Sequence, residues 1–259
     1  MAELTVLRSQ LRYQLILLAR NPRALITALV LPAILLALEL GRVQQLGSTQ
    51  AGMAVLAPRV AGLFVFGAAA IALTSHALTL VVAREDGVLR RWRASPLPAT
   101  TYFTAKIITT VLAADVAGAI LVLLSVEMAK MHVTAHAVLA MLAAGTLGAL
   151  ALAAIGTAIT ALIPSSQAAQ PMLTLIYLPL VFLSGSFGPT GNLPHWVSTA
   201  VTYLPVQPMI DALNRGLTGS GALLSAHDLL VLIGWLAAGL VASWLFFRWD
   251  PSRPRHARG

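Results

Sequence analysis

The chain has 259 residues, of which 58% are hydrophobic and only 10% charged, and its mean hydropathy is +0.83. Soluble domains carry about 25% charged residues, so this composition excludes an ordinary soluble protein. The net charge of +8 comes from basic residues beside apolar runs, where they orient a membrane protein rather than bind nucleic acid. The absence of cysteine excludes disulfides, thiolate catalysis and cysteine-ligated metals.

The first 23 residues do not have the pattern of a membrane span. Leucines recur at helical spacing from Leu4 to Leu18, while Arg8 and Arg12 fall on the opposite face. This pattern predicts an amphipathic helix over residues 1–23 that lies in the membrane interface, with its arginines toward the lipid headgroups. Asn21-Pro22 is expected to end the helix.

Six apolar stretches follow, and each can cross a hydrocarbon core of about 30 Å. The sequence therefore predicts an all-α integral membrane protein in which residues 1–259 form one transmembrane domain. Pro32 is expected to kink the first span, and Pro179 lies in the fifth. The six stretches lie near residues 24–41, 60–83, 104–126, 137–163, 171–187 and 229–247.

The basic residues predict the orientation of these spans. With the N-terminus inside, 13 of the 17 Lys and Arg residues fall in or beside cytoplasmic segments and four fall outside. This bias predicts that both termini, including the basic tail 248–259, are cytoplasmic. Arginine outnumbers lysine 15 to 2, which is typical of GC-rich bacteria, so we expect a bacterial plasma membrane.

The cytoplasmic loop 84–103 has an unusual composition for its length. Its residues 84–98 read REDGVLRRWRASPLP. Anchoring by positive charge explains the arginines, but it does not explain the acidic pair or the glycine. We therefore expect this loop to dock a soluble partner. On a helix, Asp86 and Arg90 would be four apart and able to pair, and Gly87 would let a partner surface approach closely.

The long external segment 186–228 is rich in Gly and Pro and too apolar for a solvated loop. This composition favours short helices that re-enter the membrane surface before the last span. Such a segment has two interpretations, an interfacial cap with aromatic anchors or a gate at the outer end of a pathway.

Asp115 and His76 are titratable residues that lie well inside the predicted spans. Asp115 lies near the middle of the third span, where an aspartate costs about 2.5–3.5 kcal/mol, so it should face protein or water. His76 in the second span is a candidate partner, and a hydrogen bond that joins helices is favoured over a role in substrate or proton passage. No metal site is expected, because His132 and His136 have only Glu127 as a nearby acid.

Two parts of the sequence resemble the permeases of ABC-2 type transporters. The first is the loop 85–91 with the proline-containing stretch 95–98 after it, which resembles the family's cytoplasmic loop, although Trp92 stands where the family usually has an aliphatic residue. The second resembles the family's C-terminal signature and comprises Leu183-Ser184-Gly185, Pro189, Leu193-Pro194-x-Trp196, Leu204-Pro205 and Asp211-Ala212-Leu213-x-Arg215.

This resemblance implies the membrane subunit of an ATP-binding cassette exporter, in which two membrane subunits form the pathway and cytoplasmic ATPase subunits drive it. The partners it implies are an ATP-binding subunit, a second copy or related permease, and membrane lipid. It implies coupling to the ATPase through Glu85, Asp86, Gly87, Leu89, Arg90 and Arg91. It implies an external gate that includes Gly185, Pro189, Pro194, Trp196, Pro205, Asp211 and Arg215.

No cofactor is expected in the chain itself. Its two lysines, Lys106 and Lys130, do not follow a glycine, so a Walker A phosphate loop is missing and ATP with its Mg²⁺ would belong to the partner. The alanine-rich and leucine-rich spans favour a drug-like or lipid-like substrate over a polysaccharide. An intramembrane enzyme is the weaker alternative, because the chain has neither H-E-x-x-H nor G-x-S-x-G, and a scaffold would need the same spans without a pathway.

Overall fold

The computed structural model describes residues 2–20, 23–45, 50–94, 99–129, 133–183, 194–219 and 221–247. These residues form helices joined by short connections, and none of them lies in a strand. Two short pieces, π-helical η1 and 3₁₀-helical η2, continue longer helices. The elements are α1 Ala2–Arg20, α2 Arg23–Gln45, α3 Gln50–Ala69, η1 Ala70–Ser75, α4 His76–Glu85, α5 Val88–Arg93, α6 Ala99–Ala129, α7 Ala135–Ile159, η2 Thr160–Leu162, α8 Ser166–Leu183, α9 His195–Thr202, α10 Val206–Thr218 and α11 Ala226–Phe246.

Five helices in the described part of the chain are long and apolar enough to cross a membrane. The first predicted span, 24–41, is helical within α2, but α2 is not one of these five, so the sixth crossing stays a prediction. The five helices are Leu56–Glu85, Thr100–Met128, Ala135–Leu162, Ser166–Leu183 and Ala226–Phe246.

All five of these helices begin earlier than the apolar runs indicate, as α6 and α8 show. Helix α6 starts at Ala99, inside the predicted loop 84–103, and α8 starts at Ser166 rather than near residue 171. The first turn of α8 is polar, and the amide of Ala168 donates to Ser165 Oγ at 3.2 Å, which is an N-cap contact. Hydropathy does not register such a polar first turn.

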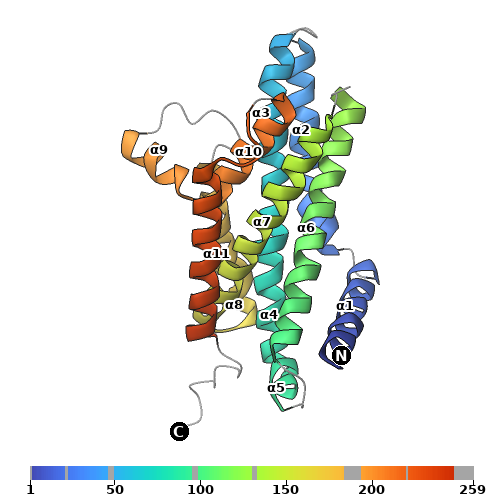
Figure 1. The fold of residues 1–259 in the computed structure, drawn as a ribbon, viewed down its shortest axis with the longest axis vertical. Helices are drawn as coiled ribbons and strands as arrows, with labels where there is room; N and C mark the ends of the chain where they lie inside the picture. Colours follow the sequence, from blue (N-terminus) through green and yellow to red (C-terminus); the bar gives the residue numbers. More distant parts are fainter. Residues whose placement is uncertain are drawn as a thin grey trace.

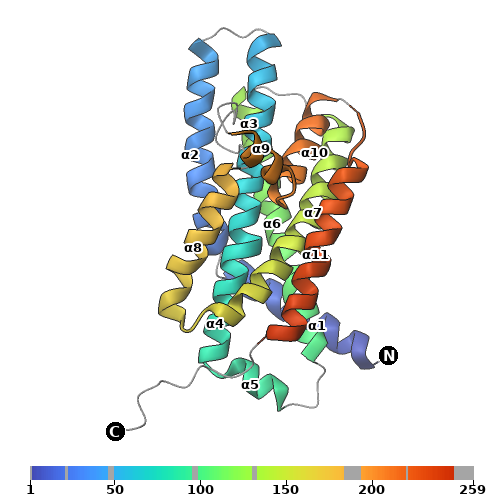
Figure 2. The ribbon, with the colours of Figure 1, turned by 90° about the vertical axis from the view of Figure 1, so that its left-hand side faces the viewer.

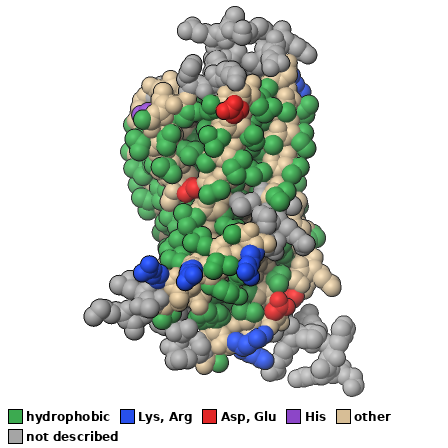
Figure 3. Space-filling model, turned by 90° about the vertical axis from the view of Figure 1, so that its right-hand side faces the viewer, with side chains coloured by type: hydrophobic (Ala, Val, Ile, Leu, Met, Phe, Trp, Pro, Cys, Tyr) green, Lys and Arg blue, Asp and Glu red, His purple; other side chains and the backbone are tan. Residues whose placement is uncertain are grey.

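The long helices form an elongated bundle with two distinct ends (Figures 1 and 2). Helices α1 and α5 and the last turn of α11 lie at one end, whereas α9, α10 and the tips of α2 and α3 lie toward the other. A broad band of hydrophobic side chains covers the face in Figure 3, and most Lys and Arg side chains on that face lie below it, toward α5.

The core of the bundle depends on close approaches at small residues. Phe64 and Met209 are fully buried between helices. A Cβ on Gly118 would come within 1.9 Å of the Phe64 ring, and one on Gly148 within 2.2 Å of Met209 Sδ. Glycine at these two positions therefore lets α3 approach α6 and lets α10 lie directly against α7.

Candidate functional site

The turn between α4 and α5 is built around Gly87. Helix α4 ends at Glu85, and Gly87 has a φ of 69°, in the left-handed region that glycine adopts without strain. No atom lies within 4 Å of the position of a Cβ on this glycine. The backbone conformation, rather than a close approach inside the chain, is therefore sufficient reason for glycine at this turn.

Helix α5 is fixed to the bundle along one face. Leu89 is 0% exposed and packs with Leu80 of α4 and Tyr102 of α6. The Trp92 ring lies 5.3 Å from that of Tyr102, so the tryptophan adds to this apolar anchor. Leu89, predicted as a coupling residue, therefore holds α5 in place and does not contribute to the exposed surface.

The charged residues of this turn are exposed, but they do not pair as the sequence predicts. Asp86 precedes α5, so it is not on one helix with Arg90, and the described residues contain no ion pair between these two. Instead, Arg91 Nη2 donates to the backbone oxygen of Asp86 at 3.2 Å. The amide of Ser166 donates to Glu85 Oε1 at 2.7 Å, which ties the end of α4 to the start of α8.

Arg84 is a residue of this region that sequence reasoning counted only as a topological charge. Its side chain is buried, with the residue 2% exposed. Nη1 donates to the carbonyl oxygen of Thr160 at 2.9 Å, and Nη2 donates to that of Ile163 at 2.5 Å. No local pattern distinguishes a buried arginine at the end of a span from an exposed one, so the sequence held no signal for this role.

His76 and Asp115 each join helices, but not to each other, so their predicted pairing is wrong. His76 Nδ1 lies 2.9 Å from Thr110 Oγ1 of α6, and Nε2 lies 2.9 Å from Thr157 Oγ1 of α7. Thr157 donates its hydroxyl hydrogen to Ala153 O, so it accepts from His76, and Nε2 carries the ring proton.

Asp115 makes its side-chain contact with Thr146 rather than with His76. Thr146 of α7 donates its hydroxyl to Asp115 Oδ2 at 2.8 Å. Gly145 leaves room for the carboxylate, because a Cβ there would lie 3.0 Å from Oδ1. The contact links α6 to α7, which is the helix-joining role that the sequence favoured.

At the other end of the bundle, the predicted gate residues fall on two short helices. Pro194 precedes α9, which carries Trp196 with 74% of its surface exposed, and Pro205 precedes α10. Asp211 and Arg215 both lie on α10. Gly185 and Pro189 lie outside the described residues.

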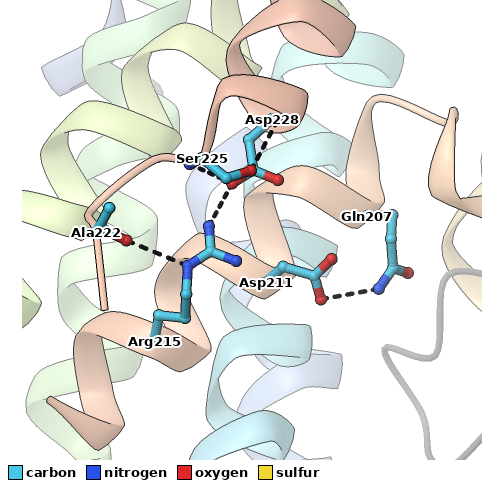
Figure 4. A network of polar contacts seen from close by, with 6 residues as sticks. All are labelled: Gln207, Asp211, Arg215, Ala222, Ser225 and Asp228. Carbon is cyan, nitrogen blue, oxygen red and sulfur yellow. Dashed lines mark hydrogen bonds and ion pairs between the residues drawn. The ribbon is translucent and has the colours of Figure 1, made fainter. Parts of the chain in front are cut away.

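Arg215 of α10 is the centre of a polar network with the start of α11 (Figure 4). Its Nη2 forms an ion pair with Asp228 Oδ2, and its Nε donates to the Ala222 carbonyl at 3.2 Å. Asp228 is 3% exposed and forms a capping box with Ser225, whose amide donates to Oδ2 at 2.8 Å. Sequence reasoning did not identify Asp228, because it placed this residue at the end of the external segment 186–228 and began the last span near residue 229.

Asp211 lies beside this network without joining the ion pair. Gln207 Nε2 donates to Asp211 Oδ1 at 3.0 Å, one turn earlier on α10 (Figure 4). Burial raises the pKa of Asp211 above its ordinary value, and the Gln207 hydrogen bond opposes that shift. The network fixes α10 to α11, and it supplies no nucleophile with an adjacent base.

The described residues contain no group of three or more His, Cys, Asp or Glu side chains that could hold a metal ion, and His132 lies outside them. The model of the ABC-2 type transporter family matches residues 5–217. The chain belongs to the ABC-2 type transporter family. No curated protein matches its sequence.

As an ABC-2 permease, the chain is the membrane component of an ABC transporter, and the resemblance seen in its sequence is confirmed. The matched range includes the α4–α5 turn and the whole of α9, and it ends at Leu217 near the end of α10. Arg215 therefore lies inside the family region, whereas its partner Asp228 comes after it.

Proposed function

We propose that this ABC-2 permease exports a hydrophobic or amphiphilic substrate, such as a drug or a lipid, from the cytoplasm or inner leaflet of a bacterial plasma membrane. A separate cytoplasmic subunit would hydrolyse ATP, and a second copy or a related permease would complete the pathway. The observation that carries the proposal is α5, a short helix with a buried apolar face and an exposed charged face.

The two faces of α5 suit a docking helix. Arg90 and Arg91 are exposed beside Asp86, so a partner meets both signs of charge. Leu89 contacts residues of both α4 and α6, so a force applied to α5 passes into two helices of the bundle. Charge that only orients a membrane protein needs no such apolar anchor.

The arrangement of the two ends supports the proposed orientation of the permease in the membrane. Helix α5 and the first turns of α1 lie at the end where most of the basic side chains in Figure 3 gather, which corresponds to the cytoplasmic side under the positive-inside rule. The predicted gate residues on α9 and α10 lie toward the opposite end. In this orientation, the network around Arg215 would brace the outer exit.

His76 and Asp115, two polar groups inside the spans, favour an apolar substrate. His76 uses both ring nitrogens for contacts within the chain, and Asp115 is bonded to Thr146. Recognition of a sugar chain needs several polar groups with free hydrogen-bonding capacity. An amphiphile is therefore the preferred substrate class, and a polysaccharide is the alternative.

Transport in reconstituted vesicles tests this proposal. The permease is purified with the ATP-binding subunit that accompanies it, and export of an amphiphilic fluorescent dye is compared with export of a soluble oligosaccharide. We expect dye movement that needs both ATP and the second subunit, with a non-hydrolysable ATP analogue as the control. Dye movement by the permease alone, or ATP-driven movement of the oligosaccharide only, would contradict the proposal.

A further inference from the structure

Helix α4 is fastened to the corner between α7 and α8, which we define as residues 157–166. His76 contacts Thr157 at 2.9 Å near the start of α4. At the end of α4, Arg84 donates to Thr160 O and Ile163 O, and Glu85 accepts from the amide of Ser166. These polar contacts of α4 therefore reach one stretch of ten residues.

The adjacent residues Arg84 and Glu85 bind the ends of two different helices. The carbonyls of Thr160 and Ile163 that Arg84 contacts lie at the carboxyl end of α7 and η2, where the helix dipole is negative. The Thr160 carbonyl also accepts from the Ile163 amide at 3.3 Å. The amide that Glu85 contacts belongs to the first residue of α8, where donors are unpaired and the dipole is positive. Each side chain thus carries the charge that its helix end favours.

We propose that Arg84 and Glu85 form a clamp on the α7–α8 corner, so that α5, α4 and the corner move as one body when an ATPase subunit acts on α5. Arg84 is a positioning residue in this device, since its buried guanidinium does not reach the surface of α5. The inference rests on the proposed coupling role of α5. In addition to that role, a movement of α5 would reach α7 and α8 through the contacts that Arg84 and Glu85 make with the ends of these helices.

The geometry gives the clamp a direct connection to α5. Only Asp86 and Gly87 separate Glu85 from the first residue of α5, and Leu89 packs against Leu80 of α4. Val81 of α4 and Ile163 of the corner belong to one buried apolar cluster, which also includes Leu173 of α8. A displacement of α5 that left the corner behind would break charge-assisted hydrogen bonds of a buried arginine, which are costly to lose.

Spin labels on α4 and α8 test the clamp. The chain has no cysteine, so Val82→Cys and Gln167→Cys introduce the only two labelling sites, and both side chains are exposed. We expect one narrow distribution of the distance between the two labels within one chain, with the same mean in the nucleotide-free and ATP-trapped complexes. Arg84→Met should broaden this distance distribution. The ATPase subunit should still copurify with the variant, but substrate-stimulated ATP hydrolysis should fall about tenfold.

A second variant cuts the other contact of the clamp and leaves the side chains of the docking surface unchanged. Ser166 is the first helical residue of α8, where proline is well tolerated, and Ser166→Pro removes the amide that Glu85 binds together with the Ser166 hydroxyl. We expect it to broaden the same distribution to a smaller extent. Ala135→Pro is the matched control, because Ala135 is the first residue of α7 and follows the N-cap residue Thr134.

Either of two results would overturn the clamp. The first is a label distance in the parent protein that changes between the two nucleotide states. The second is that Arg84→Met and Ser166→Pro both keep the parent's width of the distance distribution and the parent's rate of substrate-stimulated ATP hydrolysis. If Arg84→Met fails to fold, Ser166→Pro alone tests the clamp, through the width of the distance distribution and the rate of ATP hydrolysis. Absence of any ATPase subunit from the purified parent would instead contradict the proposed function. The label width measured in the permease alone would then still test the clamp.

Discussion

At the scale of single residues, Asp228 is central to the polar contacts between α10 and α11. Its buried carboxylate pairs with Arg215 and accepts from the Ser225 amide. Asp228→Asn keeps the size of the side chain but leaves Arg215 without a charged partner. We expect a loss of about 2 kcal/mol in the free energy of unfolding, since one member of the pair is buried and the other is partly exposed.

Thermal unfolding of the detergent-solubilised protein measures this loss as a fall in the melting temperature. Glu39→Gln is the matched control, because it makes the same carboxylate-to-amide change in the Glu39–Arg42 pair, where the Arg42 side chain is 74% exposed. An exposed pair contributes about 0–1 kcal/mol. Equal melting temperatures for the two variants would show that the Arg215 network does not brace α10 against α11.

Asp115 allows a prediction about transport. Thr146 donates to its carboxylate, and the side-chain oxygen of an asparagine accepts the same hydrogen bond. Asp115→Asn should therefore preserve both the amount of folded protein in the membrane and most of the transport rate. A variant present at normal abundance that no longer transports would show that the charge of Asp115 acts on substrate or protons.

The side-chain partners of these residues could not be predicted from the sequence. His76 binds threonines that lie 34 and 81 residues away, and their meeting depends on the rotation of α6 and α7 about their axes. The sequence identified His76 and Asp115 as polar groups in apolar helices. Such groups need hydrogen-bonding partners, because an unpaired polar group in an apolar environment is costly. The sequence contains many threonines that could be these hydrogen-bonding partners, and no local feature shows which of them are.

At the scale of elements, the left-handed turn at Gly87 separates α4 from α5. Gly87→Ala places a Cβ in a conformation that costs about 1–2 kcal/mol for other residues, although no atom obstructs it. We expect the variant to shift the orientation of α5 and to reduce recovery of the ATPase subunit, as measured by copurification. Membrane insertion should not change.

Gly41 supplies the control for this substitution. A Cβ on Gly41 also meets no atom within 4 Å, but Gly41 lies within α2 and its φ is not positive. Gly41→Ala should be neutral or should stabilise the protein by up to about 1 kcal/mol. If both variants retain the ATPase subunit at parent levels, the turn geometry is not needed for docking.

The apolar runs predicted the long helices well, but they missed the first turns of α6 and α8. The polar first turn of α8 is stabilised by Ser165, and α6 begins with the aromatic residues Tyr102 and Phe103, which pack against α5 and the end of α11. The division of loop 84–103 into a left-handed turn and α5 depends on the backbone angle of one glycine. Composition alone does not reveal that angle.

At the scale of the whole molecule, the two ends of the bundle should face opposite sides of the membrane. Ala94 is exposed next to α5, and Trp196 is 74% exposed on α9. In a chain without cysteine, Trp196→Cys should react with an impermeant thiol reagent added to intact cells, whereas Ala94→Cys should react only after permeabilisation. The reverse pattern would invert the proposed orientation.

The central claim is that an ATPase subunit drives this permease through the exposed face of α5, and charge reversal at Arg90 tests it most directly. Arg90→Glu changes an exposed residue and leaves Leu89 and the clamp intact, while Arg42→Glu makes the same change at the tip of α2, toward the opposite end. The measurement is substrate-stimulated ATP hydrolysis by the purified complex. We predict that Arg90→Glu lowers it about tenfold or more and that Arg42→Glu does not change it. Parent-level hydrolysis in Arg90→Glu would contradict the account.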